Sequence, residues 1–150
     1  MADYHIAQYN IARMRAPLGD PIMAGFLARL DELNHLADRS PGFVWRYQTE
    51  EGHSTSVRPY PDEMININMS VWQSIDALHD FAYRGGHAPA YAARHAWFEP
   101  LDGYTLVLWW VRAGHLPDVP EAMERLELLR RRGPTPEAFT MKQRFPPPEG

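Results

Sequence analysis

The stretch Met64-Ile65-Asn66-Ile67-Asn68-Met69-Ser70-Val71-Trp72 (MININMSVW) alternates between large apolar and polar side chains. Residues two apart on a β-strand share a face, so this period predicts a strand with one apolar row and one polar row. The apolar row has an obvious use in a core. The polar row needs a local reason, because asparagine is a poor strand former and two of them occur here.

Residues 5–13 repeat the pattern, with Gln8 and Asn10 set between apolar neighbours. If the apolar rows of both segments lie under helices, the polar rows share one surface that faces the space between two sheets. Buried amides without partners would cost about 1–3 kcal/mol each, so such a row implies ordered water, a hydrogen-bond network or a ligand. We expect a ligand cavity or a structural, water-filled seam, with a solvated face as the third alternative.

Cap residues and apolar periods predict the remaining elements. In chain order they are a helix from Asp20 to about residue 38, a strand over 43–49, a helix from Ser74 to Gly85-Gly86, a short helix from Pro89 to near Phe98 and a strand over 104–111. This β-α-β-β-α-β order predicts an α+β, ferredoxin-like fold, an antiparallel sheet with helices on one face. The other face would be bare, so we expect a second copy to cover it in a homodimer.

The C-terminal residues are expected to form an appendage to a core of about residues 4–112. Residues 113–150 contain a helix that ends at Gly133, followed by an extended tail. The segment 139–145 alternates weakly, which is typical of a segment along a sheet edge or a partner subunit. We treat the whole chain, 1–150, as a single domain.

Composition limits the classes of function. A chain of 150 residues suits one compact domain, and its formal charge of -4 disfavours a nucleic-acid surface. The absence of cysteine excludes disulfides and thiolate chemistry. The start MADYHIAQYN has no signal-peptide pattern, and no apolar run reaches the roughly 20 residues that cross a bilayer. We therefore expect a cytoplasmic protein without a membrane partner.

His87 is the candidate catalytic residue. It lies between the Gly85-Gly86 pair and the helix start at Pro89, where an imidazole could reach a cleft and act as a general acid or base. The alternative is that His87 caps the next helix or binds a loop carbonyl. A metal site is disfavoured, because His95 lies eight positions later, roughly 12 Å along a helix, and its neighbour Tyr91 has no carboxylate at matching spacing.

Aromatic and basic residues supply the other candidate contacts. Trp109 and Trp110 point opposite ways on a strand, so one is expected in the core and the other at the cavity wall. Strand register decides whether Arg46 or Trp45 joins the polar row. The expected substrate-binding residues are Gln8, Asn10, Arg46, Asn66, Asn68, Tyr91, His95, Trp97 and Trp110.

Six phrases, in order along the chain, carry a resemblance to a known family. They are IARMRAPL, PGFVWR, VWQSIDALHDFAYRGGH, AWFEP, LWWVRAGHLP and GPTPEAFTMKQRF. The sequence resembles the family DUF3291, a domain of unknown function, and through it the dimeric α/β-barrel superfamily. That superfamily includes small antibiotic-biosynthesis monooxygenases, EthD-like proteins, polyketide cyclases and the haem-binding chlorite dismutase group.

The resemblance implies a small-molecule-binding protein with a cavity between sheet and helices. A cofactor-independent monooxygenase, isomerase or cyclase acting on an aromatic or polyketide-like substrate is the first expectation. A non-catalytic dimeric ligand-binding or interaction protein is the alternative. Haem binding, with His87 or His95 as axial ligand, is a minor third option. The family description names no reaction, and a fold alone does not supply one.

Overall fold

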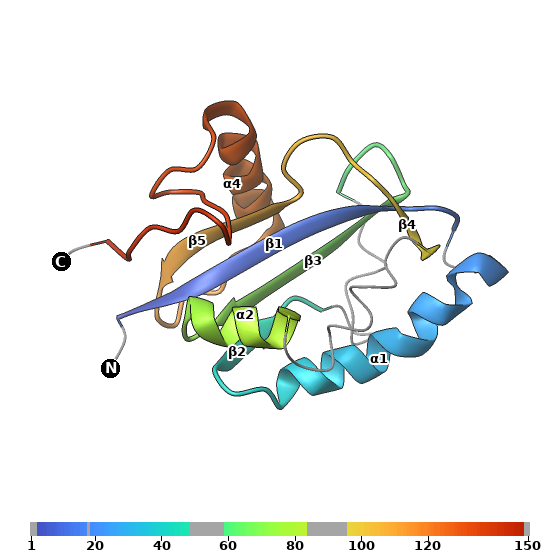
Figure 1. The fold of residues 1–150 in the computed structure, drawn as a ribbon, viewed down its shortest axis with the longest axis horizontal. Coiled ribbons are helices and arrows are strands. Elements are labelled where there is room, and N and C mark those ends of the chain that lie inside the picture. The colour runs from blue at the N-terminus through green and yellow to red at the C-terminus, as the bar shows by residue number, and fades with distance from the viewer. Residues whose placement is uncertain (1–2, 18, 49–58, 84–95, 149–150) are drawn as a thin grey trace.

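The computed structural model describes residues 3–17, 19–48, 59–83 and 96–148, which form an α+β fold (Figure 1). The elements are β1 (Tyr4–Met14), η1 (Pro21–Met23), α1 (Ala24–Asp38), β2 (Phe43–Arg46), β3 (Ile65–Trp72), α2 (Ile75–Tyr83), β4 (Phe98–Glu99), β5 (Leu106–Arg112) and α4 (Val119–Arg132). The predicted strands and the predicted helices that fall on described residues occur in the predicted order, whereas most of the short helix predicted from Pro89 lies outside the described residues. The α+β fold class is confirmed.

The long strand β1 lies at the centre of an antiparallel sheet. It pairs with β3 on one side and with β5 on the other, and β2 extends the sheet beyond β3. This spatial order, β2-β3-β1-β5, is that of the ferredoxin-like arrangement. The register places Gln8 opposite Ser70 and Asn10 opposite Asn68, so the two polar rows are direct neighbours, as predicted.

The apolar face of the sheet is covered by α4. The buried side chains Tyr9, Ile67 and Trp109 belong to one core cluster with Leu126 and Leu129 of α4. The expectation that the apolar rows lie under α1 and α2 is therefore wrong, because the C-terminal helix provides the apolar surface that buries them. The same helix occupies part of the face on which a second copy was expected, so the bare face no longer argues for a homodimer.

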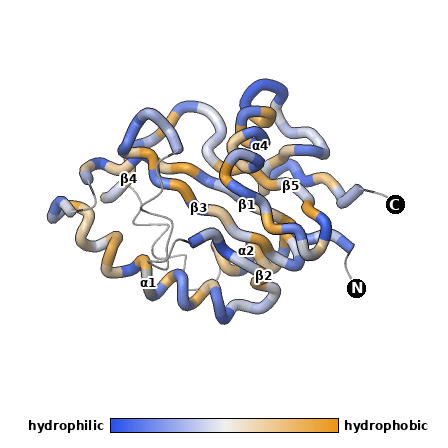
Figure 2. The backbone as a smooth tube through the Cα atoms, turned by 180° about the vertical axis from the view of Figure 1, so that it is seen from behind, coloured by the Kyte–Doolittle hydropathy of each residue, from blue (hydrophilic) through white to orange (hydrophobic). Residues whose placement is uncertain are grey.

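The polar face carries α1 and α2, on the side of the sheet opposite α4 (Figure 1). Here Trp72 and Leu108 pack with Leu78 of α2 and with Phe139 of the C-terminal segment. Along α1 and α4 hydrophobic and hydrophilic residues alternate (Figure 2). The stripe of α4 is buried at Ala122, Leu126 and Leu129. Phe139 exchanges two backbone hydrogen bonds with Leu108, of 2.8 and 2.9 Å, so the predicted sheet-edge segment 139–145 meets the sheet at this one residue.

Two predicted elements differ from the observed ones. The strand predicted over 43–49 ends at Arg46, and Phe98 lies in β4 rather than at the end of a helix. The pairing of β4 with Arg13 and Met14 explains this, since the end of β1 offers unpaired backbone groups to a passing segment. In the part of the chain that is described, no helix combines the length and the apolar character needed to span a bilayer.

Candidate functional site

A cavity of about 570 Å³ lies between the polar face of the sheet and the helices α1 and α2. Its floor is the polar row, to which β1 contributes Gln8 and Asn10 and β3 contributes Asn66, Asn68 and Ser70. This combination of helical cover and polar floor places the predicted asparagine row in a pocket between sheet and helices. We expected the polar row to face the space between two sheets, because the apolar rows were expected under the helices. That expectation is wrong, since the polar row faces α1 and α2.

The opposite wall is apolar and comes from α1. Asp20 accepts a hydrogen bond from the Ile22 backbone N–H at 3.0 Å, which fixes the start of this helical segment. Leu30, Leu33 and Phe26 then recur at helical spacing and face the cavity, each only partly buried. A ligand that filled the cavity would therefore bury apolar surface on α1 that the empty protein leaves accessible.

Gln8 organises the cavity floor. Its Nε2 donates to Asn68 Oδ1 at 2.7 Å and to Ser70 Oγ at 2.8 Å, and its Oε1 accepts from Asn10 Nδ2 at 2.8 Å. Ser70 Oγ also accepts from the Trp72 indole N–H at 2.9 Å. The two bonds from Gln8 Nε2 cross from β1 to β3 and the other two lie within one strand, so the polar side chains of the floor are held in fixed orientations.

Asn66 completes the polar row at the end of the floor near the aromatic wall. Its Oδ1 is buried without a partner among the described residues. It faces Ala12 across the strand pair, and Ala12 has no side-chain polar group to offer it. An unsatisfied buried oxygen of this kind is unusual in a folded protein and marks a candidate functional position.

Arg46 lines the cavity, whereas Trp45 packs against the core on the α4 side. The register settles the alternative, because Arg46 pairs with Ser70 of the polar row and Trp45 pairs with Val71 of the apolar row. The Arg46 guanidinium donates from Nε to Asp38 Oδ1 at 2.8 Å. The charge of this residue at the cavity wall is thus compensated by a carboxylate from α1.

An aromatic group closes one end of the cavity. Trp97 is buried, and its ring centroid lies 5.8 Å from that of Phe26, which in turn contacts Phe98 edge-on at 5.1 Å. All three residues line the cavity, and substrate binding by Trp97 stays a prediction. Such rings can stack on a flat ligand.

A charged cluster lies beside the cavity at the end of β1. Arg13 forms ion pairs with Asp62 at 2.8 Å and with the cavity-lining Glu99 at 2.7 Å. A hydrogen bond from the Met64 backbone N–H and the Arg13 side chain together lower the pKa of the Asp62 carboxyl. The cluster ties β4 to the sheet and holds Glu99 in place.

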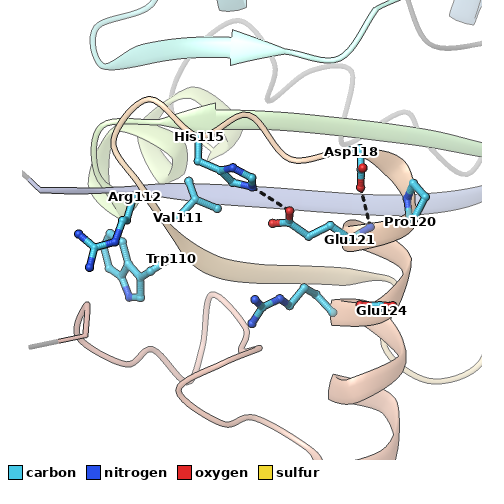
Figure 3. Close-up of a pocket in the computed structure, with 9 residues that line it drawn as sticks. Trp110, Val111, Arg112, His115, Asp118, Pro120, Glu121 and Glu124 are labelled. Atoms are coloured by element: carbon cyan, nitrogen blue, oxygen red, sulfur yellow. Dashed lines mark hydrogen bonds and ion pairs between the residues drawn. The ribbon is translucent and has the colours of Figure 1, made fainter.

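Trp110 is not part of this cavity. Its indole N–H donates to the Phe145 carbonyl at 2.9 Å, and its ring lines a separate groove beside α4 (Figure 3). In that groove His115 Nε2 lies 2.8 Å from Glu121 Oε1, while Glu121 Oε2 accepts from the buried Trp109 indole. Sequence reasoning missed this cluster, although the Asp118-x-x-Glu121 spacing at the start of α4 was a recognisable capping signal.

Three predicted residues, His87, Tyr91 and His95, lie outside the described residues. Sequence reasoning also missed the α1 wall, because the helical period shows which residues share a stripe but not that a cavity separates the stripe from the sheet. Within the described ranges, no group of three or more His, Asp or Glu side chains is placed to hold a metal ion.

The sequence matches one protein family, described as domain of unknown function (DUF3291), over residues 5–150. Two crystal structures of SnoaB, a cofactor-independent oxygenase from Streptomyces nogalater, are similar to this chain with a TM-score of 0.49 each. The point mutant is 19% identical and covers 78% of this chain and 100% of its own, and the other structure is 18% identical with 79% and 99%. No protein of curated function matches the chain.

Proposed function

The chain belongs to the DUF3291 family, whose description assigns no reaction, and we propose that it binds a small, largely apolar molecule in the cavity between the sheet and helices α1 and α2. The observation that supports this is the contrast between the two walls. One wall is an apolar helix face with accessible Leu30 and Leu33, and the other is a row of amides held by hydrogen bonds. This pairing of apolar walls with few fixed polar groups is typical of small-molecule sites.

The chemistry we propose is that of a cofactor-independent enzyme, of monooxygenase, isomerase or cyclase type, acting on an aromatic or polyketide-like substrate. In its first step a C–H bond beside a carbonyl breaks, the electron pair moves to the carbonyl oxygen as an enolate, and the proton passes to a base. The amides of Asn66 and Asn68 would stabilise the enolate oxygen. His87 is the proposed base.

The second candidate is a binding or interaction protein without catalysis. In this candidate the protein is a homodimer. The state of the floor favours this candidate, because Gln8 uses both ends of its amide within the network and Arg46 is paired with Asp38. Groups that are already engaged within the protein are not free to take part in a reaction of the ligand. The two candidates share the cavity and differ in the role of His87.

Binding is tested with naphthalene and 2-naphthol by fluorescence titration of the wild type and two α1 variants. Leu30→Trp fills the cavity and should weaken binding at least about tenfold, whereas Leu27→Trp adds the same side chain at a position that is 38% exposed and should not. Equal affinity of the two variants, with both folded by circular dichroism, contradicts a ligand site in this cavity.

Catalysis is tested by exchange of solvent deuterium into the carbon beside the carbonyl of 2-tetralone, followed by NMR. His87→Ala should abolish catalysed exchange while leaving the affinity for 2-tetralone unchanged. If the wild type binds 2-tetralone and catalyses no exchange, the binding candidate is the better account.

A further inference from the structure

The hydrogen-bond network determines which end of the Asn68 amide meets a ligand. Asn68 Oδ1 accepts from Gln8 Nε2 at 2.7 Å and from Asn10 Nδ2 at 3.4 Å, so the oxygen points along the floor toward β1. The Nδ2 group has no partner among the described residues, and the side chain is exposed within the cavity lining. Asn68 therefore offers N–H donors to the cavity.

Asn10 is oriented in the opposite sense. Its Nδ2 donates to Gln8 Oε1 at 2.8 Å, so its donor end is already engaged along the strand. Its Oδ1 accepts no hydrogen bond within the described part of the chain, and the half-buried side chain lines the cavity. Asn10 therefore offers an acceptor.

The donor and the acceptor are neighbours, because Asn10 and Asn68 are direct partners across β1 and β3. We propose that this pair selects a planar ligand with a hydrogen-bond acceptor and a hydrogen-bond donor on adjacent atoms, as in a lactam or an enolised hydroxy-carbonyl. The carbonyl of the ligand accepts from Asn68, and its N–H or O–H donates to Asn10. This specificity rests on the proposed function of the cavity and names the ligand class for it.

The surrounding charges favour a neutral ligand edge over a carboxylate. A carboxylate offers two acceptors and no donor, which would leave Asn10 Oδ1 facing an anion. Among the described lining residues, the cation Arg46 is paired with Asp38 at 2.8 Å and the anion Glu99 is paired with Arg13 at 2.7 Å. Neither arrangement attracts an anion to this part of the floor.

The test compares three probes of one shape by fluorescence titration. Both 1-methyl-2-quinolone and 3-methyl-2-quinolone have the carbonyl and equal volume, but only the 3-methyl compound retains the N–H. Naphthalene lacks both groups. The wild type should bind the 3-methyl compound about tenfold more tightly than the 1-methyl compound, the effect of one hydrogen bond to a group that is otherwise unpaired.

Two variants separate the roles. Asn10→Ala removes the acceptor and should bring the ratio of the two quinolones close to one. Asn68→Asp keeps an oxygen for Gln8 but removes the cavity-facing donor, so both quinolones should bind about tenfold more weakly while naphthalene is unaffected. Gln143→Ala, an exposed amide in the C-terminal segment, is the matched control and should change nothing.

The outcomes distinguish the inference from the proposed function beneath it. If naphthalene and both quinolones bind the wild type with equal affinity, the cavity binds ligands and the donor–acceptor selection is wrong. If none of the three probes binds, the selection and the proposed function are both contradicted.

Discussion

At the scale of single residues, Gln8 is the side chain on which the cavity floor depends. It is 4% exposed and bonds to Asn10, Asn68 and Ser70. Gln8→Leu would leave these groups without their shared partner and should lower the free energy of unfolding by about 1–3 kcal/mol. Urea denaturation checks this against Gln143→Leu, for which we expect no measurable loss. A Gln8→Leu protein as stable as that control would show that the network does not stabilise the fold.

Tyr9 makes the free energy of unfolding depend on pH in the alkaline range. Burial, followed by the 2.8 Å hydrogen bond to Tyr60, raises the pKa of the Tyr9 hydroxyl far above its usual value of 10. The unfolded chain therefore releases this proton at lower pH than the folded chain, so the stability that Tyr9 provides is complete below about pH 10 and is lost as pH rises further.

The variant Tyr9→Phe tests this linkage. It should cost about 1 kcal/mol at pH 7 through the lost hydrogen bond. The cost should shrink between pH 10 and 11, because phenylalanine has no proton to release on unfolding. Urea denaturation of wild type and variant at pH 7 and at pH 11 measures the cost of the substitution at each pH. A cost that stays constant or grows with pH would contradict the argument.

At the scale of elements, the junction between α1 and β2 depends on Gly42. This residue has a φ of +81°, and a Cβ there would lie 2.5 Å from the Ala77 Cβ of α2. Gly103 has a φ of +74° and open space around it, so it is the matched control.

Both Gly42→Ala and Gly103→Ala should lose about 1–2 kcal/mol to the left-handed backbone. Gly42→Ala should lose more than this, because α2 must shift away from the new methyl group. Thermal or urea unfolding measures the difference between the two variants. Equal losses would show that α2 moves at no cost.

The packing of α4 on the sheet depends on Glu121. Its Oε2 accepts from the indole of Trp109, which is fully buried. Glu121→Ala should lower the free energy of unfolding by about 1–3 kcal/mol, because the indole N–H loses its acceptor. Glu124→Ala, at an exposed position one turn along the same groove, should have little effect. Denaturant titration with tryptophan fluorescence reports on both, and similar values for the two variants would rule out the anchoring role.

The sequence predicts those features of the elements that depend on neighbouring residues, and not those that depend on distant ones. The alternation in β1 and β3 predicted the shared polar row of Gln8, Asn10, Asn66 and Asn68, because the two-residue period is local. The alternation along a strand does not show which helix packs on each face of the sheet. The β2 register was open for the same reason, since an irregularity between Phe43 and Trp45 determines which side chains face the cavity.

At the scale of the whole molecule, the main difference from the sequence-based expectation is the role of residues 113–150. They were expected to be an appendage, yet Leu126, Leu129, Ala138 and Phe139 are buried in the two main core clusters. Which face α4 covers depends on long-range packing, so no sequence period could show it. Because α4 takes the apolar face, the polar face is left for α1 and α2, and a cavity forms above the amides.

The central claim is that this cavity binds a small molecule. NMR titration of ¹⁵N-labelled protein with 3-methyl-2-quinolone tests it most directly, through the side-chain amide signals of Asn10 and Asn68 and the indole signal of Trp97. These signals should shift saturably with one dissociation constant, while the indole of Trp110 and the amide of Gln143, which lie outside the cavity, should not. Saturable shifts confined to Trp110, or no saturable shift at any of these groups, would contradict the account.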